Sequence, residues 1–173
     1  MYRHIRPLIY RLTPEQAHTL TIALLRASGA IPPAAALLRA LFRPARPGPT
    51  VAAFGLKFAN PLGMAAGYDK DGLAWRGLAA LGFGHIELGT VTPRPQPGNP
   101  QPRLFRLVED EAVINRMGFN NHGAAFLARR LQGKRPPDLV LGVNIGKNKT
   151  TPVEEAAQDY LYLLRSFAPL ADY

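Results

Sequence analysis

Apolar residues recur at the three- and four-residue spacing of helices in the first third of the chain. A helix is predicted to begin after Thr13, because Pro14 suits the first helical position and Gln16 completes a capping box. This helix is expected to end near Gly29, and a shorter helix follows it. The apolar positions are Ala17, Leu20, Leu24 and Leu25 in the first helix, and Ala36, Leu37, Leu41 and Phe42 in the second.

From Val51 onward, short strand-like runs alternate with helical ones. A capping residue at Asn120 or Asn121 and a capping box at 151–154 are expected to begin two of the helices. Alternation of this kind predicts a parallel sheet covered by helices, here in three βα units. The strands are predicted at 60–66, 85–93 and 139–149, and the first two helices at 73–81 and 120–131. The third helix is predicted to share one apolar face among Val153, Ala157, Tyr160, Leu161, Leu164 and Phe167.

Polar side chains follow each predicted strand at its carboxyl end. Lys70 follows the first strand, Thr90 and Thr92 end the second, and Asn144 and Lys147 end the third. In α/β folds this edge of the sheet is where ligands bind. The repetition on three successive strands favours one shared site over three solvated loop ends.

Charge divides the chain into two regions. Residues 1–47 hold seven arginines and a single acid, Glu15, within a chain of net charge +9. Arginine beside leucine and isoleucine is typical of helices at a membrane surface, but the same helices could instead pack on the main domain. Pro7 argues against a regular helix at 1–12. Nucleic acid is not expected as a partner, because aromatic stacking groups are not interleaved with the basic residues.

Several other classes of protein are excluded or disfavoured. The chain has no cysteine, so a disulfide framework and a thiolate metal site are both impossible, and no metal site is expected. We expect neither a signal peptide nor a membrane-spanning helix, because no apolar run approaches the ~18 residues that a span requires. The run GFGHIE fails as a dinucleotide fingerprint, and GVNIGKNKT fails as a phosphate loop.

Four long segments resemble, in order, the strand-end loops of one enzyme family. They are NPLGMAAGYDKDG, GFGHIELGTVTPRPQPGNPQPRLFRL, INRMGFNNHG and GVNIGKNK. The resemblance is to the class 2 dihydroorotate dehydrogenases, which are quinone-dependent and membrane-associated. It covers residues 54–173 and extends weakly to LTPEQAHTL. The class 1 relatives, which are soluble and use fumarate or NAD, are disfavoured because they lack the arginine-rich helix pair.

The resemblance implies an α/β fold, the N-terminal portion of a (β/α)8 TIM barrel preceded by a small helix pair. Residues 1–42 would form the helix pair at the membrane and quinone tunnel, 43–50 a linker rich in proline and arginine, and 51–173 the first part of the barrel. The implied activity is FMN-dependent oxidation of dihydroorotate to orotate in pyrimidine biosynthesis, with a ubiquinone-like acceptor. The implied location is peripheral, on the cytoplasmic face of a bacterial inner membrane or an equivalent respiratory membrane.

The resemblance also assigns residues to sites. Lys70 would lie between flavin and substrate, where an ammonium can stabilise the negative charge of the reduced flavin. Without the resemblance, a surface lysine paired with Asp69 or Asp71 would be the simpler interpretation. The FMN residues would be Ala66, Gly67, Tyr68, Asp69, Lys70, Thr90 and Asn144. Besides Lys70, the substrate would meet Asn115, Arg116, Met117, Gly118 and Phe119. The quinone tunnel would include His18 and Arg106, although His18 could equally be a histidine satisfied locally on a helix face.

A (β/α)8 barrel needs roughly 250 residues, and the chain has 173. The serine base of the family is expected beyond Tyr173, as is the usual phosphate site. We therefore expect these residues alone to be inactive. Two alternatives remain open at this point: a non-catalytic piece that binds a membrane or a partner, and one half of a split enzyme.

Overall fold

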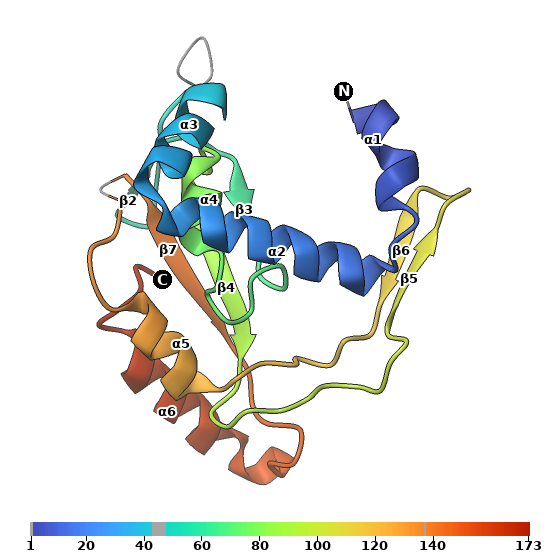
Figure 1. Ribbon diagram of the computed structural model, residues 1–173. Coiled ribbons are helices and arrows are strands. Elements are labelled where there is room, and N and C mark those ends of the chain that lie inside the picture. Colours follow the sequence, from blue (N-terminus) through green and yellow to red (C-terminus); the bar gives the residue numbers. More distant parts are fainter. Residues whose placement is uncertain (1, 43–47, 137) are drawn as a thin grey trace.

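The computed structural model describes residues 2–42, 48–136 and 138–173, so that residues 43–47 of the predicted linker lie outside it. At the centre is a three-stranded parallel sheet in the order β3, β4, β7. Each strand is followed by a helix on the outer side (Figure 1). The three units are β3 (Gly63–Met64) with α4 (Trp75–Ala80), β4 (His85–Val91) with α5 (Ala124–Leu131), and β7 (Val140–Ile145) with α6 (Ala156–Phe167). The predicted order of three βα units is confirmed.

Two predicted helix starts are wrong. Gly123 occupies the N-cap position of α5, and Asn121 lies two residues earlier, where its Oδ1 accepts the amides of both Gly123 and Thr92. A 3-10 turn at Val153–Glu155 precedes α6. The hydroxyl of Thr151 donates to Asp159 at 2.7 Å, so no capping box forms there. Both polar groups serve contacts that a local sequence pattern cannot show. The first strand is also shorter than predicted, since only Gly63–Met64 pairs with β4.

The buried core lies between the sheet and the helices α4, α5 and α6. Leu163 and Phe167 are the buried residues of α6, whereas Leu161 and Leu164 are half exposed. Of the apolar face predicted for α6 only Phe167 is buried, because the helix is apolar on two sides and the other side packs on the sheet among the described residues. The core residues are Trp75, Leu78, Ile86, Leu88, Val91, Ala124, Leu127, Leu131, Leu139, Leu141, Leu163 and Phe167.

Three helices precede the barrel units: α1 (Tyr2–Ile9), α2 (Pro14–Ala30) and α3 (Pro32–Phe42). The capping box predicted at Thr13 is confirmed, with its hydroxyl accepting from the Gln16 amide and the Gln16 side chain accepting from the Thr13 amide. The doubt about residues 1–12 was wrong over most of that stretch, because α1 contains Pro7 and remains helical. Helix α2 lies across α4 (Figure 1).

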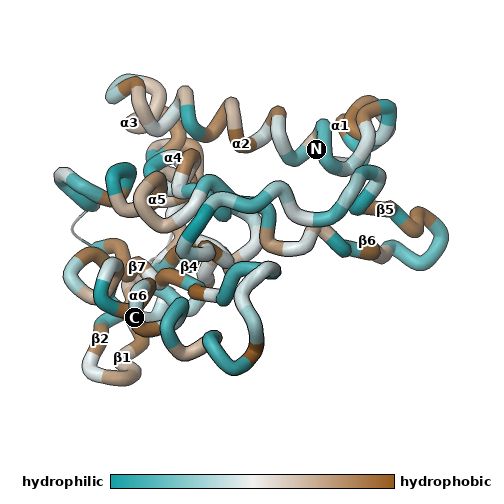
Figure 2. Tube along the Cα trace, turned by 90° about the horizontal axis from the view of Figure 1, so that it is seen from below, coloured by the Kyte–Doolittle hydropathy of each residue, from teal (hydrophilic) through white to brown (hydrophobic). Residues whose placement is uncertain are grey.

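An apolar face of α2 and α3 is exposed, and brown positions mark it along this layer in Figure 2. No described helix is by itself long and apolar enough to cross a bilayer. Helices α2 and α3 pass that test only as a pair, and they are bent by 109° at their junction. The exposed large apolar residues of this face are Leu20, Leu24, Ile31, Leu37, Leu41 and Phe42.

Two antiparallel hairpins were not predicted. The first joins β1 (Val51–Ala53) to β2 (Leu56–Phe58) through Phe54 and Gly55, whose φ angles of 53° and 75° are those of a tight hairpin turn. The second joins β5 (Leu104–Leu107) to β6 (Ala112–Asn115). This hairpin extends away from the sheet toward the α1–α2 junction (Figure 1). It places residues 104–115 beside the N-terminal helices.

Candidate functional site

The carboxyl ends of the three parallel strands come together. The hydroxyl of Thr90, near the end of β4, donates to Oδ1 of Asn144 on β7 at 2.6 Å. The Asn144 amide in turn donates to Glu87 at 3.1 Å. The loop after β3 reaches the same place, because the Gly67 amide donates to the carbonyl of Gly89 at 2.7 Å. The convergence expected from three parallel strands is present.

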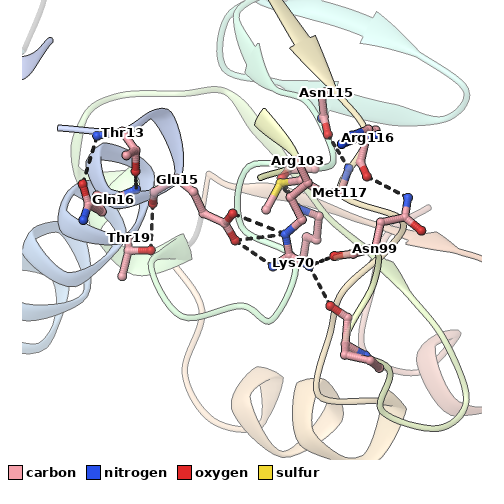
Figure 3. Close-up of polar contacts among 12 residues, drawn as sticks. Thr13, Glu15, Gln16, Thr19, Lys70, Asn99, Arg103, Asn115, Arg116 and Met117 are labelled. Carbon is pink, nitrogen blue, oxygen red and sulfur yellow. Dashed lines mark hydrogen bonds and ion pairs between the residues drawn. The ribbon is translucent and has the colours of Figure 1, made fainter. Parts of the chain in front are cut away.

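Lys70 is buried at this edge, with 8% of its surface exposed. Its Nζ donates to the Gly67 carbonyl at 2.9 Å and lies 3.5 Å from Sδ of Met117 (Figure 3). Burial lowers the pKa of the lysine, and the nearby Arg103 lowers it further, while Asp71 and Glu15 oppose the shift. Within the described residues Lys70 makes no ion pair with Asp69 or Asp71, so it is not the surface lysine of the simpler interpretation.

Asp69 fixes the loop that carries Lys70. Its carboxylate is 2% exposed and accepts the amide hydrogens of Leu73 and Ala74, each at 2.7 Å. Burial raises the pKa of this carboxyl, and the two backbone hydrogen bonds partly offset that rise. The side chain therefore closes the turn that leads into α4. The Asp69 carboxylate thus stabilises the loop and is not free to bind a ligand, whereas its backbone could still contact one.

The residues 115–119 form a second side of the site. Met117 is buried, and its amide donates to Oδ1 of Asn115 at 2.9 Å. Gly118 and Phe119 both have positive φ, 76° and 54°, and the Phe119 ring is half exposed. Arg116 is exposed and donates to the Pro102 carbonyl. Of this set, the structure brings Met117 to Lys70 and leaves Asn115, Arg116 and Phe119 accessible.

Comparisons with known proteins agree on one family. The model of the family described as dihydroorotate dehydrogenase matches residues 50–173. The chain belongs to the dihydroorotate dehydrogenase family. It is 54% identical over all 173 residues to the quinone-type dihydroorotate dehydrogenase of Roseiflexus sp. (strain RS-1) and 52% identical to that of Mycobacterium tuberculosis (strain ATCC 25618 / H37Rv). The chain spans 48% of the length of each of these relatives.

Solved structures of this family share the fold. The dihydroorotate dehydrogenase of Eimeria tenella, solved with ferulenol, superposes with a TM-score of 0.79 at 37% identity. The match covers 96% of this chain and 45% of that one. The ligand-free form of the Eimeria tenella enzyme gives a TM-score of 0.77 at 39% identity. The expected fold class is confirmed: the three βα units are part of the barrel found in dihydroorotate dehydrogenases.

Dihydroorotate dehydrogenases are generally flavin-dependent, and the residues at the strand ends fit a flavin. Gly67 has a φ of +101°, and a Cβ added there would meet nothing within 4 Å, so its backbone faces open space. A flat ring system can approach such a backbone closely. Lys70 supplies a fixed cation beside this space, while Thr90 and Asn144 supply a hydroxyl and an amide. Cation and hydrogen-bonding groups of this kind suit an electron-rich ring with carbonyl oxygens.

The two residues assigned to the quinone both lie against the N-terminal helices. His18 of α2 has its Nε2 2.6 Å from the carbonyl of Tyr68, so it is bonded to the loop of Lys70 and not within its own helix. The Tyr68 hydroxyl donates back to Thr21 of α2 at 2.9 Å. Arg106 of β5 donates to the Leu12 carbonyl at 2.7 Å. Helix α2 thus contacts both the loop that carries Tyr68 and Lys70 and the β5–β6 hairpin.

A cavity lies at the opposite, amino-terminal edge of the sheet. It has a volume of about 610 Å³ and is lined by Arg39, Arg76 and Lys134 together with residues that precede the three parallel strands. In barrels of this kind the amino-terminal edge contributes stability, whereas chemistry occurs at the carboxyl edge. The strand-end residues are therefore the candidate site.

Sequence reasoning missed several buried polar residues around the site. Asn121 accepts from the Thr92 amide and donates to the Phe119 carbonyl, which fixes the loop that holds Phe119. Asn148 bonds both the amide and the carbonyl of Arg94. Thr92 is fully buried, so it supports the site and does not face it. The adjacent asparagines in the motif FNNHG were the available signal for the first of these contacts.

Proposed function

We propose that the protein oxidises dihydroorotate to orotate with FMN as its cofactor and passes the electrons to a quinone, as part of pyrimidine biosynthesis. The observation that carries this proposal is the buried Lys70, held at the carboxyl edge of the sheet between the open backbone of Gly67 and the Met117 loop. Membership of the dihydroorotate dehydrogenase family and the quinone-type names of the relatives support it.

Lys70 stabilises charge in this proposal. FMN, when bound, would accept the hydride that leaves the substrate. The ammonium of Lys70 would stabilise the resulting negative charge, and burial would make this interaction stronger than it is in water. Its hydrogen bond to Gly67 fixes the direction of the ammonium before reaction. The same ammonium can pair with the substrate carboxylate.

The remaining assigned residues orient the two ligands. Ala66, Gly67, Tyr68 and Asp69 would offer backbone to the flavin, and Thr90 and Asn144 would offer a hydroxyl and an amide from neighbouring strands. Asn115, with an amide that both donates and accepts, would bind the pyrimidine edge. Phe119, half exposed beside it, would cover the ligand and exclude water. The serine base expected for the family is not among these residues.

The N-terminal helices α1, α2 and α3 are proposed as the contact with membrane and quinone. Their exposed apolar face and their arginines are the pattern of helices that lie in a lipid headgroup layer. His18 contacts the Tyr68 carbonyl in the loop of Lys70, and Arg106 contacts Leu12 just before α2, so a quinone held by both would lie beside that loop. This arrangement favours a peripheral location on a respiratory membrane.

The first prediction tests the charge role of Lys70. In the full-length protein, Lys70→Ala is expected to slow flavin reduction by dihydroorotate by about 10²–10³-fold, because one preorganised charge at a developing anion contributes roughly 3–4 kcal/mol. Stopped-flow absorbance at saturating substrate measures the rate, and flavin titration measures binding. Lys57→Ala, an exposed lysine on β2, is the matched control. A Lys70→Ala rate within threefold of wild type would refute the proposal.

A further inference from the structure

One ion pair joins the N-terminal helices to the substrate side of the site. Arg103, which precedes β5, is 9% exposed and donates from Nη2 to Glu15 at 2.7 Å and from Nε to both Glu15 oxygens at 3.1 and 3.3 Å. Glu15 lies in the first turn of α2, where the positive end of the helix dipole favours its negative charge. Arg103 also holds the pKa of Glu15 below its usual range. The pair therefore stays charged at neutral pH.

The same guanidinium holds the loop between β4 and β5. Its Nη1 donates to the carbonyls of Pro97 and Asn99, at 2.7 and 3.0 Å. Asn99 in turn bonds the segment that follows β6. Its amide donates to the Met117 carbonyl at 2.9 Å, and its side chain donates to the Arg116 carbonyl at 2.7 Å. Figure 3 shows this continuous set of contacts from α2 to Lys70.

We propose that Glu15 and Arg103 are positioning residues through which helix α2 holds the Met117 loop against Lys70. Neither residue is expected to touch the substrate. The expected effect on the rate of flavin reduction rests on the proposed function. The positioning of the Met117 loop does not, because the contacts from Glu15 to Met117 exist whatever the reaction. It gives the helix pair a role on the dihydroorotate side of the flavin, in addition to the quinone side.

Burial and electrostatics explain why an ion pair is needed here. An unpaired guanidinium near Lys70 would be a second buried cation beside the first, which is costly. Glu15 neutralises Arg103, so that the Lys70 ammonium does not lie beside an unpaired second cation. The fork of the guanidinium then bonds three partners at once, which the single ammonium of a lysine cannot reproduce with the same geometry.

The first experiment measures backbone order without the flavin. Glu15→Gln and Arg103→Lys are made in the full-length protein, with Thr19→Ala as control, since Thr19 is exposed on the same helix and bonds only the Glu15 carbonyl. Hydrogen exchange is followed in peptides covering 97–103 and 115–117. We expect exchange there to be about tenfold faster in both variants and unchanged in the control. Unchanged exchange in both variants, or equal loosening of α4 and α5, would overturn the proposal.

The second experiment measures flavin reduction by dihydroorotate in the same proteins. We expect the rate at saturating substrate to fall about tenfold or more in Glu15→Gln and Arg103→Lys, because small misplacements of reacting groups cost at least this much. Rates within twofold of wild type in both variants would overturn the kinetic part. If wild-type protein is not reduced by dihydroorotate at all, the proposed function fails, and the exchange experiment still decides the positioning role.

Discussion

Lys70 is a buried cation whose neighbours act on it in opposite directions. Burial and the charge of Arg103 lower its pKa, whereas Asp71 and Glu15 raise it. These three charged groups belong to the loop before β5, to the Lys70 loop itself and to α2. The protonated lysine is the form that can stabilise negative charge on a flavin, so under the proposed function we expect the activity to depend on pH through this residue.

This dependence gives a second prediction. Because the pKa of Lys70 is lowered in the folded protein, the ammonium loses its proton at a pH below the usual lysine pKa of 10.5. Flavin reduction should therefore fall as pH rises through the folded pKa. A pH series of stopped-flow reduction rates measures this limb, and Glu15→Gln should move it to lower pH, since an attracting charge is removed. A rate that stays level up to pH 10.5 would contradict the assignment.

A third prediction concerns the buried carboxylate of Asp69. Each of its oxygens accepts one backbone amide hydrogen. Asparagine supplies only one acceptor oxygen, so Asp69→Asn turns an NH₂ group toward the second amide. We expect a loss of roughly 1–3 kcal/mol in the free energy of unfolding, measured by denaturant titration. Asp110→Asn, in the exposed β5–β6 turn, is the control, and equal stability of the two variants would contradict this account.

Among the elements, the helix pair was the most predictable from the sequence. Its spacing and the capping box at Thr13 are local signals, and the structure confirms both. The β1–β2 hairpin was missed because its strands have three residues each, too few to show a period.

At the site, Lys70 could be singled out through the resemblance. The Glu15–Arg103 pair could not, since 88 positions separate two residues that carry no local motif.

The exposed face of α2 and α3 leads to a fourth prediction. Leu41→Asp in the full-length protein removes an exposed apolar side chain of α3 and adds a negative charge. Binding to anionic vesicles should weaken about tenfold or more, because both apolar and electrostatic attraction are reduced. Sedimentation with vesicles at low and high salt measures this. Val153→Asp, equally exposed at the start of α6, should bind as wild type does; equal weakening by both would count against the assigned face.

At the scale of the whole molecule, the three βα units form an arc, which is part of a barrel in the solved dihydroorotate dehydrogenases that this chain resembles. The quinone-type relatives from Roseiflexus sp. (strain RS-1) and Mycobacterium tuberculosis are about twice as long as this chain. In (β/α)8 barrels, phosphate commonly binds after strands seven and eight. Within the described residues, β3 has one edge without a strand partner, and the outer edge of β7 is bonded only by Asp172 and Tyr173.

The fifth prediction follows from this arc. Residues 1–173, purified with excess FMN and then freed of unbound flavin, are expected to retain little yellow absorbance and to show no bleaching by dihydroorotate. The open edge of β3 and the incompletely bonded edge of β7 should also promote association between chains, which light scattering would detect. The full-length protein treated in parallel is the control. A stoichiometric flavin band that bleaches at an enzymatic rate would show that these residues are sufficient.

Helices α2 and α4 cross at two glycines, Gly29 and Gly77. A Cβ on Gly29 would lie 2.5 Å from the Gly77 nitrogen, and one on Gly77 would lie 2.1 Å from the Leu25 carbonyl oxygen. The two backbones are thus in direct contact, which leaves no layer of side chains that could slide. If α2 and α3 lie flat on a bilayer, the barrel cannot rotate independently of them. Its axis would then keep a constant tilt to the membrane plane.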